Sequence, residues 1–146
     1  MESTMRPQLL ATETTNISTG RLWAARIMGG LPVLFMFFDA IMKFVKPAPV
    51  VEAFARSGWP LQLSATLGAI LLTCTALYVI PRTSVLGAVL LTGYLGGAVA
   101  TNLRLENPLF SNTLFPVYFG VLVWASLLLR NPRLSEYFLL VKRQDG

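Results

Sequence analysis

The chain has 146 residues, of which 54% are hydrophobic and only 13% are charged, and its mean hydropathy is +0.60. Soluble domains carry about 25% charged residues, so this composition is typical of an integral membrane protein. The net charge of +5 does not indicate a nucleic-acid partner, because the basic residues stand beside apolar stretches, as they do around membrane helices, and form no patch.

Residue types also limit the chemistry. The chain has one cysteine, Cys74, and no histidine, which excludes an internal disulfide and a zinc site built on cysteines. Few groups remain that could ligate a metal or a haem, so we predict no metal site. No catalytic motif is recognised, and we predict no catalytic residue.

Residues 1–20 are polar, rich in Ser and Thr, and show no apolar periodicity. They lack the basic start and the apolar core of a secretory signal. We therefore predict a flexible tail over residues 1–20, a membrane domain over residues 21–132 and a C-terminal tail over residues 133–146.

Within the membrane domain, four apolar stretches can each cross a hydrocarbon core of about 30 Å. The first is predicted over residues 22–45 and the second over residues 63–80. The third begins by Val85 and reaches Arg104, and the fourth covers residues 114–129 or starts near Leu109. The turn at Pro81 is so short that the second and third spans must be antiparallel. The fold class is therefore predicted as all-α, an antiparallel bundle of four transmembrane helices.

A short amphipathic helix is predicted between the first two spans, within residues 49–60. Val50, Val51 and Phe54 lie on one apolar face. Gly58 is expected to end the helix, and Trp59 is expected at the level of the lipid head groups. Such a helix lies along the membrane surface and does not cross the bilayer.

With four spans, both termini lie on the same side of the membrane. Of the 12 basic residues, eight fall on that side and four on the other. The positive-inside rule then places both termini in the cytoplasm. The eight are Arg6, Arg21, Arg26, Arg82, Arg130, Arg133, Lys142 and Arg143, and the four are Lys43, Lys46, Arg56 and Arg104.

This topology brings polar residues from distant parts of the chain into the outer half of the bundle. Asp39 and Lys43 lie one turn apart near the end of the first span, in the favourable order for a helical ion pair. Ionisable residues inside a membrane usually mark function, but this pair could also be a flank that reaches for the membrane surface. Likewise, Asn102 and Arg104 either bind a ligand head group or only satisfy the helix end. The candidate ligand-binding residues are Asp39, Lys43, Tyr94, Thr101, Asn102 and Arg104.

Glycines form a stripe on the third span, at Gly93, Gly96 and Gly97. In water each would cost about 1 kcal/mol of helix stability. In lipid, small residues let a neighbouring backbone approach closely. We therefore predict that these glycines pack against a helix, either of this chain or of another subunit.

Five motifs occur together and in order: FDAIMK (38–43), PAPVVEAF (47–54), GWP (58–60), YVIPRT (78–83) and GYLGGAVATNLR (93–104). With these motifs the chain resembles the DoxX-like family, small four-helix membrane proteins of bacteria, over about residues 21–132. The resemblance implies a multi-pass protein of the bacterial inner membrane. Relatives often carry His where this chain has Asn102, which argues against proton transfer at that position and leaves hydrogen bonding.

The wider DoxX family includes a subunit of an archaeal thiosulfate:quinone oxidoreductase. The resemblance therefore implies a non-catalytic membrane subunit that binds a lipophilic ligand such as a quinone, or that supports a redox partner. A second hypothesis is a structural or chaperone-like helper that packs against other membrane proteins, or against a second copy, through its glycines. A small transporter is disfavoured, because the sequence shows neither internal repeats nor broken helices.

Overall fold

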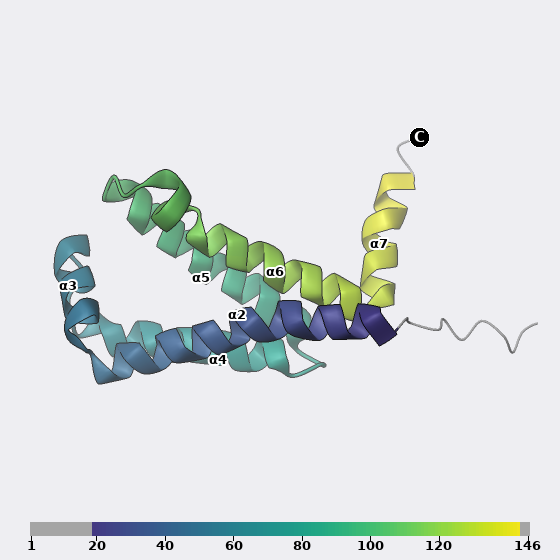
Figure 1. Cartoon of the computed structure of the whole chain (residues 1–146), viewed down its shortest axis with the longest axis horizontal. Coiled ribbons are helices and arrows are strands. Elements are labelled where there is room, and N and C mark those ends of the chain that lie inside the picture. Colours follow the sequence, from purple (N-terminus) through teal and green to yellow (C-terminus); the bar gives the residue numbers. More distant parts are fainter. Residues whose placement is uncertain (1–18, 144–146) are drawn as a thin grey trace, which may run out of the picture.

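The structure, a computed structural model, describes residues 19–143, with side chains as far as Tyr137. Every regular element in this range is helical, which confirms the predicted all-α class. The predicted N-terminal tail lies outside the described residues, except for Thr19 and Gly20, which already belong to the first helix. The elements in Figure 1 are α2 (Thr19–Val45), α3 (Ala48–Ser57), α4 (Leu63–Val79), α5 (Ser84–Arg104), the π-helical turn η1 (Leu109–Thr113), α6 (Phe115–Arg130) and α7 (Pro132–Arg143).

Three of the described helices are long and apolar enough to cross a membrane: α2 with 27 residues, α5 with 21, and η1 with α6 as a 22-residue unit. The fourth, α4, is also apolar but has 17 residues, at the lower limit of membrane-spanning lengths. We predicted that it extends to Ile80. Ile80 instead has an extended backbone, as expected for a residue before proline, and the helix ends at Val79.

Large apolar side chains cover the outside of the long helices. Leu34 is 70% exposed, Leu86 52% and Val121 61%. Side chains of this kind, exposed on several helices of one bundle, are suited to contact with lipid and not with water. The exposed surface therefore agrees with the membrane composition of the sequence.

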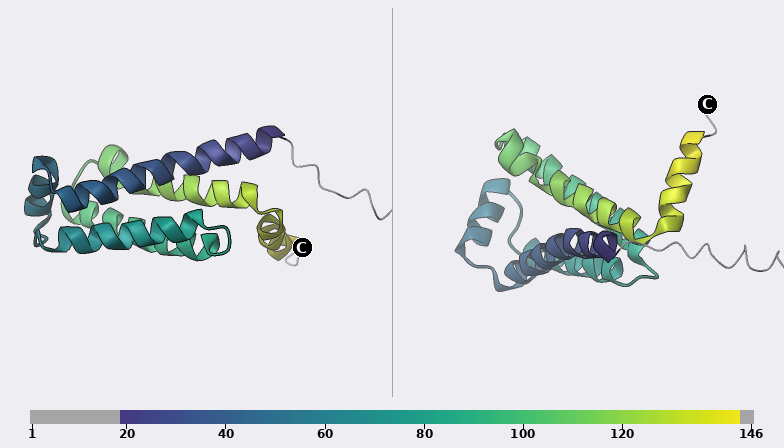
Figure 2. Two further views of the ribbon diagram at one scale, coloured as in Figure 1. Left: turned by 90° about the horizontal axis from the view of Figure 1, so that it is seen from below. Right: turned by 45° about the vertical axis from the view of Figure 1, so that its right-hand side comes forward.

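The long helices form two pairs that enclose a wedge. α2 packs against α4 and α6, and α5 also packs against α4 and α6. Figures 1 and 2 show α2 and α4 running side by side, with α5 and α6 as the second pair. The pairs converge near α7 and diverge toward α3 and η1, so the bundle has a closed end and an open end.

Close backbone contact holds the closed end together. A Cβ placed on Gly87 of α5 would lie 2.2 Å from the backbone nitrogen of Tyr78 in α4, so only glycine fits there. The buried hydroxyl of Tyr78 donates a hydrogen bond to the carbonyl of Val123 in α6 over 3.0 Å. These contacts join α4, α5 and α6 at one level.

The same end ties α2 to α6. A Cβ on Gly29 would lie 2.3 Å from the hydroxyl oxygen of Ser126. That hydroxyl donates to the carbonyl of Ala25 over 2.8 Å, and both residues are fully buried. Small residues and interhelical hydrogen bonds of this kind stabilise helix packing in lipid.

The members of each pair stay together as far as the open end. Ser64 of α4 donates to the carbonyl of Lys43 in α2 over 2.7 Å, and a Cβ on Gly68 would already be tight against Lys43 at 3.1 Å. In the other pair, the indole of Trp124 donates to the hydroxyl of Thr92 over 2.9 Å nearer the middle of the helices, and η1, which leads into α6, contacts α5 at the open end. The wedge therefore opens between the two pairs and not within either of them.

The glycines that we singled out on the third span do not make these close contacts. A Cβ on Gly93, Gly96 or Gly97 would meet no atom within 4 Å. The predicted close approach of another span is therefore not made in the described chain. No other helix reaches these glycines because they lie in the part of α5 that diverges from α2.

Candidate ligand-binding site

A cavity of about 860 Å³ fills the open end of the wedge. Its volume lies within the range of about 300–1,000 Å³ that is typical of small-molecule sites. Side chains of α2, α3, α4, α5 and α6 line it, together with residues of the loops at the open end. Its polar lining comprises Asp39, Lys43, Arg56, Ser57, Tyr94, Thr101, Asn102, Asn107 and Asn112.

The ion pair predicted from sequence is present on the α2 side of the cavity. The ammonium group of Lys43 contacts the carboxylate of Asp39 one turn earlier. The Lys43 side chain is 14% exposed and that of Asp39 37%. It is the one ion pair formed among the described residues. Because the two charges compensate each other, this wall is polar without a net charge.

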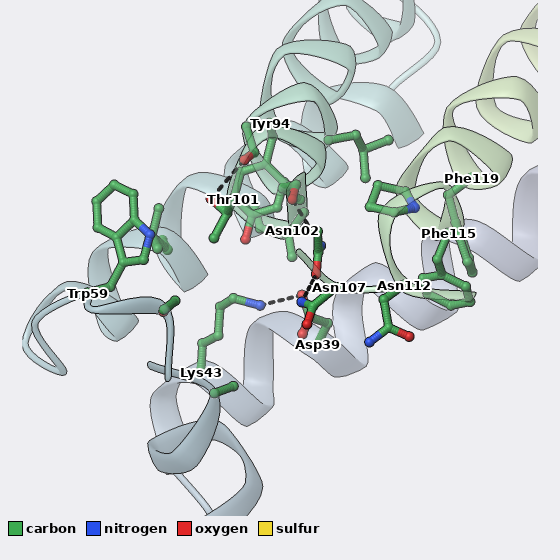
Figure 3. Close-up of a pocket in the computed structure, with 18 of the residues that line it drawn as sticks. Asp39, Lys43, Trp59, Tyr94, Thr101, Asn102, Asn107, Asn112, Phe115 and Phe119 are labelled. Carbon is green, nitrogen blue, oxygen red and sulfur yellow. Dashed lines mark hydrogen bonds and ion pairs between the residues drawn. The ribbon is translucent and has the colours of Figure 1, made fainter. Parts of the chain in front are cut away.

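A short chain of amides crosses the centre of the cavity. Figure 3 shows Asn107 donating to the side-chain oxygen of Asn102, over 2.7 Å. Asn102 donates in turn to the carbonyl of Ala98 over 2.9 Å, so its amide is used within the protein. Thr113 donates to the carbonyl of Asn107 over 3.2 Å, which connects η1 to the loop that follows α5.

Other polar groups in the lining remain free to bind a ligand. Within the part of the chain that the structure describes, neither the hydroxyl of Tyr94 nor the amide of Asn112 makes a hydrogen bond. Thr101 donates to the carbonyl of Gly97 over 2.9 Å, which leaves its oxygen able to accept. The cavity thus offers a hydroxyl and an amide that can each donate and accept.

Aromatic side chains form another wall. The ring of Phe35 stacks on that of Phe119 with centroids 4.7 Å apart, and Phe115 lies 5.5 Å from Phe35 and 4.9 Å from Phe119. In Figure 3, Phe115 and Phe119 face Trp59 across the polar centre. Aromatic walls of this kind contact flat or apolar parts of a ligand.

Five of the six residues that we predicted from sequence line this cavity: Asp39, Lys43, Tyr94, Thr101 and Asn102. Arg104 does not line it. Its guanidinium donates instead to the carbonyl of Ser57 at the end of α3. Gly93 and Gly97 also line the cavity, and their missing side chains leave it room.

The sequence analysis did not select Asn107, Asn112 and the aromatic wall. Asn107 and Asn112 lie between two predicted spans, where polar residues are common and carry little information. Phe115 and Phe119 lie in an apolar span in which every phenylalanine resembles a lipid-facing residue. A turn that holds two amides and a serine within six residues was the available signal.

Comparison with known proteins identifies the family. No curated protein and no solved structure matches the chain. The model of the DoxX-like family matches residues 27–126, which is more than half of the chain and includes every residue that lines the cavity. The resemblance seen in the sequence motifs is thereby confirmed. The helices and the family agree: this chain is a membrane protein and belongs to the DoxX-like family.

Proposed function

We propose that the protein is a non-catalytic membrane subunit that binds a lipophilic molecule with a polar head group, such as a quinone, in the wedge cavity. The observation that best supports this proposal is that the cavity combines apolar and aromatic walls with hydrogen-bonding groups that have no partner in the described protein. Few, well-placed polar groups in a largely apolar pocket are typical of sites for such ligands.

A head group that accepts hydrogen bonds fits the groups in the lining. Asp39 and Lys43 neutralise each other, which leaves the cation of Arg56 as the charge in the lining without an ion-pair partner among the described residues. Quinone carbonyls accept hydrogen bonds, and Tyr94 and Asn112 can donate them. The ring would then lie against Phe35 and Phe119, whose faces are already stacked.

The proposal includes the membrane context. Four spans in the bacterial inner membrane with both termini in the cytoplasm would place the open end of the wedge at the outer surface. Bound there, a quinone would be within reach of a redox partner on that side. The protein would hold and orient the ligand, while the partner would carry out the chemistry.

The test is binding of decylubiquinone, a short-chain quinone, to the protein in lipid nanodiscs, followed by the fluorescence of Trp59 in a variant with Trp23 and Trp124 replaced by Phe. We expect saturable quenching, because Trp59 lines the cavity. Asn112→Leu removes a free amide and should weaken binding up to about tenfold. Thr73→Val, which removes a hydroxyl far from the cavity that bonds only within its own helix, is the matched control.

Native mass spectrometry of protein extracted gently from its own membrane gives an independent result. A stoichiometric quinone or other lipophile in the spectrum supports the proposal. An empty protein that also fails to quench with decylubiquinone contradicts it.

The helper hypothesis now depends mainly on Gly96. This glycine is exposed, does not line the cavity, and has no neighbour within 4 Å of a built Cβ. Gly96→Leu should disturb assembly with a second copy or another membrane protein if this face is an interface. If crosslinking and native mass spectrometry show the same assembly size for Gly96→Leu as for the unaltered protein, the helper hypothesis is contradicted.

A further inference from the structure

Helix α3 stands across the mouth of the wedge. It connects the open-end termini of α2 and α4, and Figures 1 and 2 show it rising from them toward the other pair. Ala53, Phe54, Arg56 and Ser57 face the cavity. Phe54 and Ser57 are buried, at 9% and 8% exposure, although the helix itself lies at the edge of the bundle. α3 therefore covers the cavity with one face.

The attachments of α3 to the bundle are weak for a helix in this position. It forms no extended packing interface with another described helix. Its two ends turn at residues with a left-handed backbone, Lys46 with φ 54° and Gly58 with φ 69°. Gly58 closes the helix with its amide bonded to the carbonyl of Ala55 over 3.3 Å. A short helix between two sharp turns can swing as a unit without unfolding its neighbours.

One contact joins α3 to the opposite pair of helices. Arg104, the last residue of α5, donates through Nη2 to the carbonyl of Ser57. Among the described residues, this is the one hydrogen bond between α3 and α5 or α6. The carbonyl belongs to the last turn of α3, where the helix dipole places negative partial charge. A cation that donates to it makes a charge-assisted bond, which is stronger than one between neutral groups.

The direction of Arg104 also argues against a simple anchoring role. A basic residue at the end of a membrane helix usually extends to the lipid head groups. Arg104 instead reaches over the mouth to a backbone carbonyl in another element. A Cβ placed on Gly58 would lie 3.8 Å from its Nη2, so the guanidinium sits beside the turn where α3 ends.

We propose that α3 is a hinged lid over the cavity and that Arg104 is its latch. With the latch made, α3 covers the polar end of the cavity. With the latch broken, α3 swings on Lys46 and Gly58, and an amphiphilic molecule passes between α3 and α5. The identity of that molecule rests on the proposed function, but the movement does not.

The lid is tested without any ligand. In a Cys74→Ala background, Gly97→Cys places a thiol in the cavity lining, at a position where a Cβ has no neighbour within 4 Å. The measurement is its rate of reaction with a membrane-impermeant maleimide in nanodiscs. Adding Arg104→Gln should raise this rate about tenfold, because it removes one charge-assisted hydrogen bond.

Three controls define the result. Arg82→Gln removes a positive charge from the turn between α4 and α5, far from α3, and should leave the rate unchanged. Arg104→Lys keeps the charge and should raise the rate less than Arg104→Gln. A thiol introduced instead at Ser111, which is exposed on η1 at the same end of the bundle and does not line the cavity, should react at the same rate with and without Arg104.

Two outcomes overturn the proposal. The first is an unchanged rate at position 97 in Arg104→Gln. The second is an equal increase at positions 97 and 111, which indicates general loosening. As a second measurement, spin labels at Glu52 on α3 and Phe110 on η1, both exposed, should show a longer or broader distance distribution in Arg104→Gln.

The same thiol separates this inference from the proposed function. If decylubiquinone fails to bind but Arg104→Gln still accelerates labelling, the ligand is wrong and the lid stands. If decylubiquinone binds and protects position 97 but Arg104→Gln has no effect, the site stands and the lid is wrong.

Discussion

The two ends of the bundle use similar residue types in opposite ways. At the closed end, Gly29 and Gly87 bring backbones into contact, and the hydroxyls of Tyr78 and Ser126 bond to carbonyls of neighbouring helices. At the open end, a Cβ on Gly93 or Gly97 would meet no atom within 4 Å, and the hydroxyl of Tyr94 has no partner among the described residues. In lipid, polar groups hold helices together only where the backbones meet, and elsewhere they remain available for a ligand.

Arg130 shows how strongly the closed end is packed. Two of its nitrogens, Nε and Nη2, are buried and have no hydrogen-bond partner within the described part of the chain. Its guanidinium carbon lies 5.1 Å from the ring centroid of Tyr78. Attraction between a cation and an aromatic face, which is strongest away from water, compensates part of the cost of that burial. Tyr78 therefore has two roles: its hydroxyl bonds α4 to α6, and its ring stabilises the buried charge of Arg130.

The largest effect is expected from Gly87→Ala. The added Cβ would fall 2.2 Å from the backbone of Tyr78, which no side-chain movement can relieve. We expect a loss of about 3 kcal/mol or more in unfolding free energy, at the upper end of overpacking effects. Unfolding in mixed detergent micelles measures it. Gly93→Ala, a glycine of the same helix with open space, is the control, and equal losses in both variants would contradict the distinction between the two ends.

Next in size is the effect of filling the cavity. Gly97→Leu should weaken decylubiquinone binding at least about tenfold, because its side chain enters the ligand volume, while stability rises by up to about 1 kcal/mol from the gain in helix propensity. The neighbouring Gly96→Leu does not point into the cavity and should bind normally. Normal binding by Gly97→Leu would place the ligand elsewhere.

Removing the hydroxyl of one tyrosine at each end tests the difference between the closed and the open end directly. Tyr78→Phe loses a buried bond to Val123 and should cost about 1 kcal/mol of stability, as is typical of hydrogen bonds between membrane helices. Tyr94→Phe loses no bond within the described protein, so it should leave stability unchanged and weaken quinone binding. Equal stability losses in the two variants would show that the hydroxyl of Tyr94 has a structural partner.

The smallest effect is a stabilisation. Gly96→Ala adds a Cβ that meets no atom within 4 Å and improves helix propensity. We expect a gain of up to about 1 kcal/mol in unfolding free energy. A loss in place of a gain, together with a change in native mass, would indicate that this face is covered by another subunit.

Much of the fold follows from local sequence. Apolar stretches, Pro81 and Gly58 mark the helices and their ends, because Pro81 favours an extended backbone at the residue before it and a left-handed glycine ends a helix locally. The grouping of Asp39 and Lys43 with Tyr94, Thr101 and Asn102 also follows, since antiparallel spans bring the end of the first near the end of the third. The cavity indeed contains all five.

The contacts between helices could not be inferred in this way. Gly93 and Gly97 form a better small-residue stripe than Gly29, Gly68 or Gly87, yet only the last three meet a neighbouring helix closely. Arg104 has the pattern of a terminal anchor but bonds to a carbonyl 47 residues earlier in the chain. Which glycine is covered and which cation finds a partner depends on the angle at which helices cross, and that angle results from all the contacts together.

The chain alone therefore specifies a membrane protein of helices, their limits and the end of the bundle at which polar residues gather. These features depend on hydropathy and on backbone preferences of single residues. The tertiary structure decides that the two pairs diverge, that a cavity forms between them and that α3 lies across its mouth. These features depend on where the helix backbones come close to each other. Packing forces are short-range, so they depend on which side chains meet in three dimensions, and the order of residues along the chain does not show this.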